Sequence, residues 1–250
     1  MMNGPASLIK LAWRSLQRQR RRTALLIAVV AYATFTILFF WGFVDGFLVS
    51  ILQGQAKLVY APVTVTTPAY HDDPDPVHAL PDVAAADAAA QDAPGVQATA
   101  PRLELAALLR SPYASRGVLL RGVDPEREPR VSDVPSRIGD GRMIASPGEA
   151  VLGVALAEEL DVRVGERIAI DAASVAGPSA TGVTLVGIVD AGIELVDETT
   201  AWVHLEDARS LTGVDGATSL AVAVPPGREA SVADALDARL PDGVAAYGIM

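Results

Sequence analysis

The chain has 250 residues, of which 50% are apolar and 20% are charged, and its formal net charge is −10. Such an acidic chain gives no support to nucleic-acid binding, which requires a basic surface. It contains no cysteine, which excludes a disulfide framework and a thiolate metal site.

The start of the chain predicts a membrane anchor. Positions 1–22 hold six basic and no acidic residues, and no charged residue lies between Thr23 and Val44. About 20 helical residues at ~1.5 Å each cover the ~30 Å hydrocarbon core of a bilayer. Basic residues beside a span hold their flank in the cytoplasm, so the remainder is expected on the far side. The residues that would determine this topology are Lys10, Arg14, Arg18, Arg20, Arg21 and Arg22.

A signal peptide or a buried core helix would fit the apolar segment less well than an anchor. A signal peptide has an apolar region of about 7–15 residues and a small-residue cleavage site, whereas this segment is longer and ends in bulky residues. A core helix of a soluble protein is rarely apolar on all sides for five turns. The bulky residues Phe39, Phe40, Trp41 and Phe43 suit the aromatic belt at the outer membrane interface.

The predicted organisation has three parts. Residues 1–22 form a cytoplasmic basic segment whose pattern is that of an amphipathic helix on the membrane surface, or simply a charged flank. Residues 23–46 form the transmembrane helix, and residues 47–250 form the extracytoplasmic domain. Positions 23–250 hold 14 basic and 30 acidic residues, so the ectodomain is acidic and is not expected to bind nucleic acid or anionic lipid.

After the anchor, short strands and helices alternate, which predicts a mixed α/β fold. Helices are expected at 81–93, with Asp82 as the N-cap, and at 154–160, 205–211 and 229–240. No second segment is long enough to span a membrane. Strands are expected at 63–67, 96–101, 103–109, 118–123, 149–152, 167–171, 183–190, 201–204, 219–224 and 244–247.

The candidate chemical groups do not form a catalytic motif. His71, His78 and three aspartates between Tyr70 and His78 resemble metal ligands, but prolines interrupt them, so an exposed polar loop is preferred. His204 is read as a strand-end residue in a polar rim rather than a general base. The pairs Glu158/Glu159 and Asp197/Glu198 are read as solvated or capping groups. P-loop, H-E-x-x-H, G-x-S-x-G and G-x-G-x-x-G motifs are absent, and no catalytic, cofactor or metal residue is predicted.

Several segments of the chain share order and spacing with those of a known protein family. They are 151–160 with 162–168, 186–193 with 195–198, 202–213, and Trp13-Arg14-Ser15-Leu16 before the first span. In the segment that begins at 151, Gly153 lets a strand turn closely into a helix, and Gly165 supports the turn into the next strand. Together these segments resemble the FtsX-like ABC-transporter permeases, which include lipoprotein-releasing and macrolide-export permeases.

The resemblance implies a permease subunit of a mechanotransmission-type ABC transporter in the inner (plasma) membrane. Its ectodomain would be an α+β core with a flanking subdomain, placed between the first and second spans. Its partners would be a cytosolic ABC ATPase, a second permease (identical or a paralogue) and membrane lipid. The substrates implied are lipoproteins, lipids, peptides or drugs, with no catalytic residue and no cofactor in this subunit.

The chain departs from the family pattern at its end. Family members continue into three further spans, whereas this sequence stops at Met250, so a fragment of a longer permease is expected. The alternative is a single-pass anchored binding or scaffolding domain that works without ATP. A membrane-anchored hydrolase using His71 or His78 is the least favoured interpretation.

Overall fold

The computed structural model describes residues 20–58, 61–174 and 177–248, which fall into two compact units, 1–53 and 54–250. The first unit contains most of helix α2 (Arg20–Leu58). Its window Ala24–Gly42 is long and apolar enough to cross a membrane, and none of it is buried within the protein. The predicted surface segment at 1–19 lies outside the described residues.

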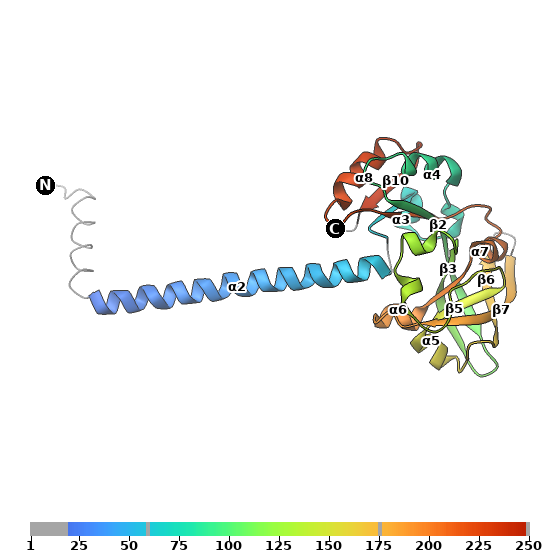
Figure 1. Cartoon of the computed structure of the whole chain (residues 1–250), viewed down its shortest axis with the longest axis horizontal. Helices are drawn as coiled ribbons and strands as arrows, with labels where there is room; N and C mark the ends of the chain where they lie inside the picture. The colour runs from blue at the N-terminus through green and yellow to red at the C-terminus, as the bar shows by residue number, and fades with distance from the viewer. Residues whose placement is uncertain (1–19, 59–60, 175–176, 249–250) are drawn as a thin grey trace. The chain divides into compact units, whose positions relative to one another are not determined.

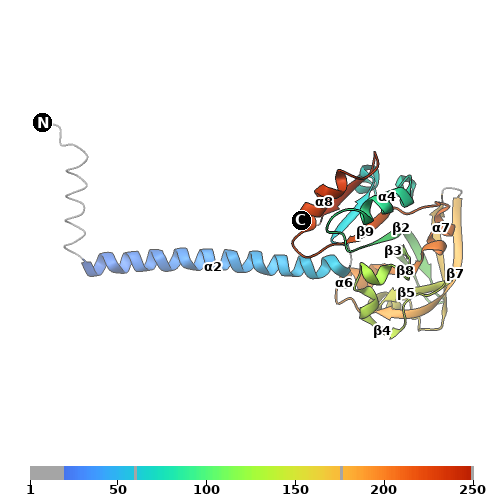
Figure 2. The ribbon, with the colours of Figure 1, turned by 45° about the horizontal axis from the view of Figure 1, so that its top comes forward.

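Six strands of the second unit form a closed ring, which is a small β-barrel. β2 pairs with β3, β3 with β8, β8 with β5, β5 with β7, β7 with β6, and β6 pairs back with β2. Figure 2 shows β2, β3, β8 and β5 following one another in this order. In chain order the strands are β2 (Ala98–Arg110), β3 (Ser115–Val123), β5 (Glu149–Gly153), β6 (Arg167–Ser174), β7 (Gly177–Val189) and β8 (Thr200–His204).

Apolar side chains that point inward alternate with outward-facing side chains along these strands, and the inward ones fill the barrel. In β2, the residues Leu103, Leu105, Ala107 and Leu109 are buried in the main hydrophobic cluster, while the residues between them face outward. Helices α5 (Val154–Glu159) and α7 (Leu205–Thr212) contribute to the same cluster. A barrel of this size encloses side chains rather than an aqueous channel.

A smaller open sheet flanks the barrel, as the resemblance implied. β1 (Val63–Thr66) lies between β10 (Ala245–Gly248) and β9 (Ser219–Ala223), and β9 pairs with the first half of β2. The β1–β10 pairing is antiparallel and places Val63 opposite Gly248. Helices α4 (Val83–Gln91) and α8 (Glu229–Asp237) share a hydrophobic cluster with this sheet, beside β10 in Figure 1. Asp82 caps α4, as predicted, by accepting the Ala85 N–H.

The prediction of two strands at 96–101 and 103–109 is wrong, because β2 is one strand of 13 residues. Proline and arginine at 101 and 102 interrupt the apolar pattern, which suggested a break. In the structure this is the point where pairing of β2 with β9 ends and pairing with β3 begins, and Arg102 takes part in both. β2 therefore joins the open sheet to the barrel.

The expected loop at 70–78 is also partly helical. Thr67 caps α3 (Pro68–Asp72) by accepting the Tyr70 N–H, and Asp75 caps the short 3-10 helix η1 (Pro76–His78). Prolines at the first turns of both helices favour rather than oppose them. Other elements that the sequence did not predict are α6 (Glu194–Thr199), β4 (Ile138–Gly141) and the 3-10 helices η2 (Glu128–Arg130) and η3 (Val134–Arg137).

Gly153 lies at the predicted turn from a strand into a helix, between β5 and α5, and it also packs closely against Asp197. A Cβ atom at this position would lie 2.4 Å from the backbone oxygen of Asp197. Asp197 itself is buried and accepts the N–H groups of Ala191 and Ile193, so it is a capping group rather than a solvated one. Its neighbour Glu198 is exposed.

Candidate functional site

Helix α2 presents apolar side chains on all sides. Between Leu25 and Trp41 its large apolar residues are at least 63% exposed, which suits lipid contact rather than a protein core. Phe39, Phe40 and Trp41 lie near the end of the apolar window. Phe43 and three of the residues predicted to determine topology, Arg20, Arg21 and Arg22, also belong to this helix. Lys10, Arg14 and Arg18 lie outside the described residues.

A groove of about 480 Å³, here called the β2 groove, lies where the open sheet meets the barrel. The strand register builds its floor. One cross-strand row contains Thr66, Ser219 and Arg102. The next row contains Tyr247, Thr64 and Ala221. These residues lie on the face of the open sheet opposite to α4 and α8, and α3 lines the groove through Tyr70 and His71.

Two ion pairs lie at the floor of the β2 groove, and one member of each pair, Arg102 or Glu104, lines the groove. Nη2 of Arg102 is 2.6 Å from Oε1 of Glu128, and Nε of Arg121 is 2.6 Å from Oε1 of Glu104. Glu104 and Arg121 are directly opposite on β2 and β3. Burial is the largest single effect on the pKa of Glu104 and raises it, but the charges of Arg121 and Arg102 and the hydrogen bonds from Arg121 and Tyr70 together outweigh burial and lower this pKa. The four charges therefore stabilise one another within the protein.

Tyr70 connects α3 to this charge cluster. Its hydroxyl donates to Oε2 of Glu104 at 3.4 Å, and burial together with the negative charge of Glu104 raises its pKa. Next to Tyr70, the ring of His71 stacks on Tyr247 with centroids 3.8 Å apart. His71 is exposed and His78 is half-buried. Within residues 20–58, 61–174 and 177–248, no group of three His, Cys, Asp or Glu residues could hold a metal ion.

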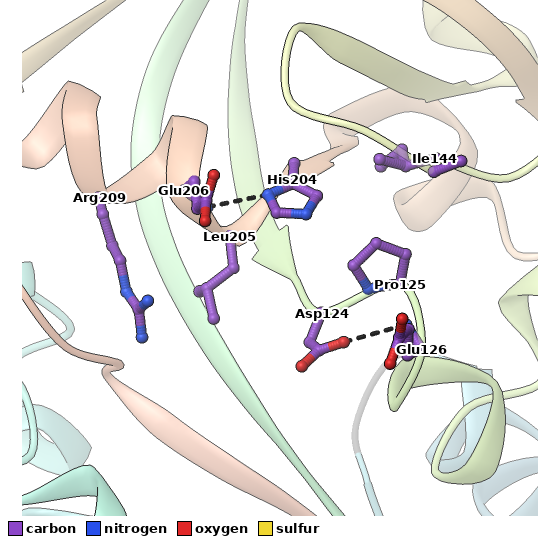
Figure 3. Close-up of a pocket in the computed structure, with 9 residues that line it drawn as sticks. Asp124, Pro125, Glu126, Ile144, His204, Leu205, Glu206 and Arg209 are labelled. Atoms are coloured by element: carbon purple, nitrogen blue, oxygen red, sulfur yellow. Dashed lines mark hydrogen bonds between the residues drawn. The ribbon is translucent and has the colours of Figure 1, made fainter.

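A second pocket, of about 530 Å³, lies beside the start of α7 (Figure 3). His204 is the N-cap of α7, and its Nδ1 accepts the Glu206 N–H at 3.2 Å. Across the pocket, Asp124 accepts the Glu126 N–H at 3.0 Å. Both polar side chains thus have structural partners on the backbone. The placement of His204 as a helix cap at a strand end agrees with the interpretation from the sequence.

The pKa of Glu149, at the start of β5, is far below its usual value, and this can be tested. Hydrogen bonds from Arg142 lower its pKa from 4.5 to about 2; burial opposes this, while the N–H groups of Ala145 and Ser146 add to it. We expect an NMR titration of the Glu149 carboxyl carbon to give this low pKa. The contact between Arg142 and Glu149 then stabilises the folded state above pH 4.5, and this stabilisation is lost as the pH falls toward 2. Arg142→Gln should raise the pKa of Glu149; an unchanged value would contradict this cause.

The family of the chain follows from comparison with known proteins. The family model described as MacB-like periplasmic core domain matches residues 23–239, which include the apolar part of α2 and most of the second unit. The chain belongs to this family. This family match confirms the predicted resemblance. Together with the structure, it also confirms the mixed α/β fold that follows an N-terminal apolar helix.

A curated relative of this MacB-like chain is the lipoprotein-releasing system transmembrane protein LolC of Neisseria meningitidis serogroup B. It is 33% identical over 130 residues, which cover 48% of this chain and 31% of LolC. The chain thus spans about a third of the length of that relative.

Two solved structures share the fold. The extracellular domain of the noncanonic ABC-type transporter YknZ from Gram-positive bacteria matches with a TM-score of 0.52 and 12% identity, over 75% of this chain and all of that one. The periplasmic region of MacB from Actinobacillus actinomycetemcomitans matches with a TM-score of 0.50 and 13% identity, over 74% and 87%. At these identities the two matches establish only the fold of the MacB-like domain, and not its function.

The sequence did not predict the β2 groove or its charge cluster. Arg102 and Glu104 are two residues apart on β2, so their side chains share one face, and this spacing is visible in the sequence. Their partners Glu128 and Arg121 come from segments that only the folded chain brings together. The sequence therefore contained a signal for only two of the four charged residues, and it did not show the contacts that hold them in the protein.

Proposed function

We propose that this chain is the permease subunit of a mechanotransmission-type ABC transporter. ATP hydrolysis by a separate cytosolic ATPase would move the extracytoplasmic domain, for the export or release of a lipoprotein, lipid, peptide or drug. The observation that carries the proposal is the family match, because it includes the apolar helix as well as the core domain. The names of LolC, a transmembrane protein of a releasing system, and of YknZ, an ABC-type transporter, support it.

The proposal includes an orientation in the inner membrane. The basic residues at 1–22 would lie in the cytoplasm, residues 23–46 would cross the lipid, and residues 47–250 would lie outside. A second permease would complete the membrane part, and ATP would be hydrolysed by the partner, since the sequence contains no P-loop.

The absence of cysteine makes the orientation directly testable. We expect Ser146→Cys, at an exposed ectodomain position, to react with a membrane-impermeant maleimide once the outer barriers of the cell are opened. Ser15→Cys should react only after the cells are lysed. The cysteine-free chain is the blank for both variants. The reverse labelling pattern would contradict the proposed orientation.

The ATPase partner is tested by purification. The chain, expressed together with its flanking genes, should co-purify with a P-loop ATPase from detergent extracts. Residues 47–250 expressed alone should not retain the ATPase, because they lack the cytoplasmic and membrane parts. If no ATPase is retained by the longer chain either, the transporter proposal fails and an anchored binding or scaffolding domain becomes the better hypothesis.

A further inference from the structure

The floor of the β2 groove contains hydrogen-bonding groups that the protein does not use. Nε and Nη2 of Arg102 donate to Glu128, while Nη1 has no acceptor among the residues described. Within the same part of the chain, the hydroxyls of Ser219 and Thr64 have no hydrogen-bond partner. Arg102 and Ser219 are only 4% and 5% exposed as residues, and both line the groove. Among the described residues, the only fully buried polar side-chain atom without a partner is Nε1 of Trp202, so the unused groups of the groove remain open to it. Polar groups that converge in a largely apolar groove can fix the orientation of a bound molecule.

The charges around these groups favour an uncharged partner. Arg102 and Glu104 in the floor are compensated by Glu128 and Arg121, which lie behind them. An anion would add negative charge beside Glu104 and Glu128, and a cation would face the donors of Arg102. A carbonyl or hydroxyl oxygen can accept from Arg102 without disturbing this balance. The acidic composition of residues 23–250 also opposes the approach of anions.

The remaining surface of the groove is largely apolar. Pro74, Ala106, Leu119 and Ala221 line it, and Ala106 is exposed although it lies in the middle of β2. The volume of about 480 Å³ is within the range of about 300–1,000 Å³ that small-molecule sites occupy. Apolar walls beside a few unused polar groups are the pattern expected for a molecule that has both kinds of surface.

We propose that the β2 groove binds an uncharged amphiphile. Its carbonyl or hydroxyl oxygen accepts from Nη1 of Arg102 and from the Ser219 and Thr64 hydroxyls, and its hydrocarbon part lies against Ala106 and Leu119. This site goes beyond the proposed transporter function and does not depend on it, because every residue involved lies in the ectodomain. The loss of an ATPase partner would leave the binding unchanged.

Three probes with the same chain length distinguish the possible ligand classes. The full chain in phosphatidylcholine nanodiscs is studied by saturation-transfer NMR with 1-hexanoylglycerol, hexanoate or hexylammonium, and empty nanodiscs are the blank. We expect 1-hexanoylglycerol to bind at least tenfold more tightly than either charged probe. Equal or tighter binding of a charged probe, or no binding above the blank, would overturn the proposal.

Variants locate the binding on the protein. Ala106→Leu fills the groove from an exposed position and should weaken 1-hexanoylglycerol binding at least tenfold. Ala180→Leu is the matched control, since it makes the same change at an exposed strand position outside the groove. Ser219→Ala and Thr64→Val each remove one hydroxyl and should weaken binding by about fivefold. Unchanged binding in Ala106→Leu, or an equal loss in Ala180→Leu, would refute the site, and circular dichroism confirms that each variant is folded.

Discussion

Replacing Glu128 by glutamine is expected to lower the free energy of unfolding of residues 54–250 by about 3–5 kcal/mol. Glu128 is fully buried and accepts two hydrogen bonds from the buried Arg102. The substitution leaves the buried guanidinium without the carboxylate that it contacts, and the loss of this charge compensation is the main cost. Urea denaturation followed by circular dichroism measures the change.

Two further variants test whether burial of the ion pair is the reason for the large loss of stability in Glu128→Gln. Glu159→Gln removes the same charge from an exposed pair, in which the side chains of Arg116 and Glu159 are 54% and 41% exposed. We expect it to cost about 0–1 kcal/mol. Changing Arg102 and Glu128 together to Met and Leu should recover much of the stability lost in Glu128→Gln. If Glu159→Gln costs as much as Glu128→Gln, burial is not the cause.

The second large effect is expected at Gly153. Gly153→Ala places a Cβ atom 2.4 Å from the backbone oxygen and 2.6 Å from the Cα of Asp197. Backbone atoms cannot rotate away, so α6 must shift, and we expect a loss of about 3 kcal/mol in the same denaturation experiment.

Gly117→Ala is the matched control for this substitution. Gly117 also lies in a strand, but a Cβ atom there meets nothing within 4 Å. Alanine should therefore be neutral or stabilise the domain by roughly 0.5–1 kcal/mol, because glycine is more flexible in the unfolded chain. Similar losses in the two variants would contradict the close packing between Gly153 and Asp197.

Local patterns predicted much of this fold. The uncharged run before Asp45 indicated α2, the N-cap Asp82 indicated α4, and alternating apolar residues indicated most strands. What local patterns could not predict is closure of the barrel, because the pairing of β2 with β6 joins residues about sixty positions apart. The apolar pattern also gave a wrong prediction at Arg102, where it suggested a break between two strands. Arg102 is instead buried within one strand, and Glu128 beside it compensates its charge.

The pairing of Val63 with Gly248 has a mechanical consequence. The first residue of β1 and the last residue of β10 lie at the same end of two neighbouring strands. We expect a force applied at Val63 or Gly248 to reach the four-residue β1–β10 pair first and to break its hydrogen bonds one after another from that end. Each of the six barrel strands pairs on both sides within the ring, so we expect the barrel to remain folded when the small sheet opens.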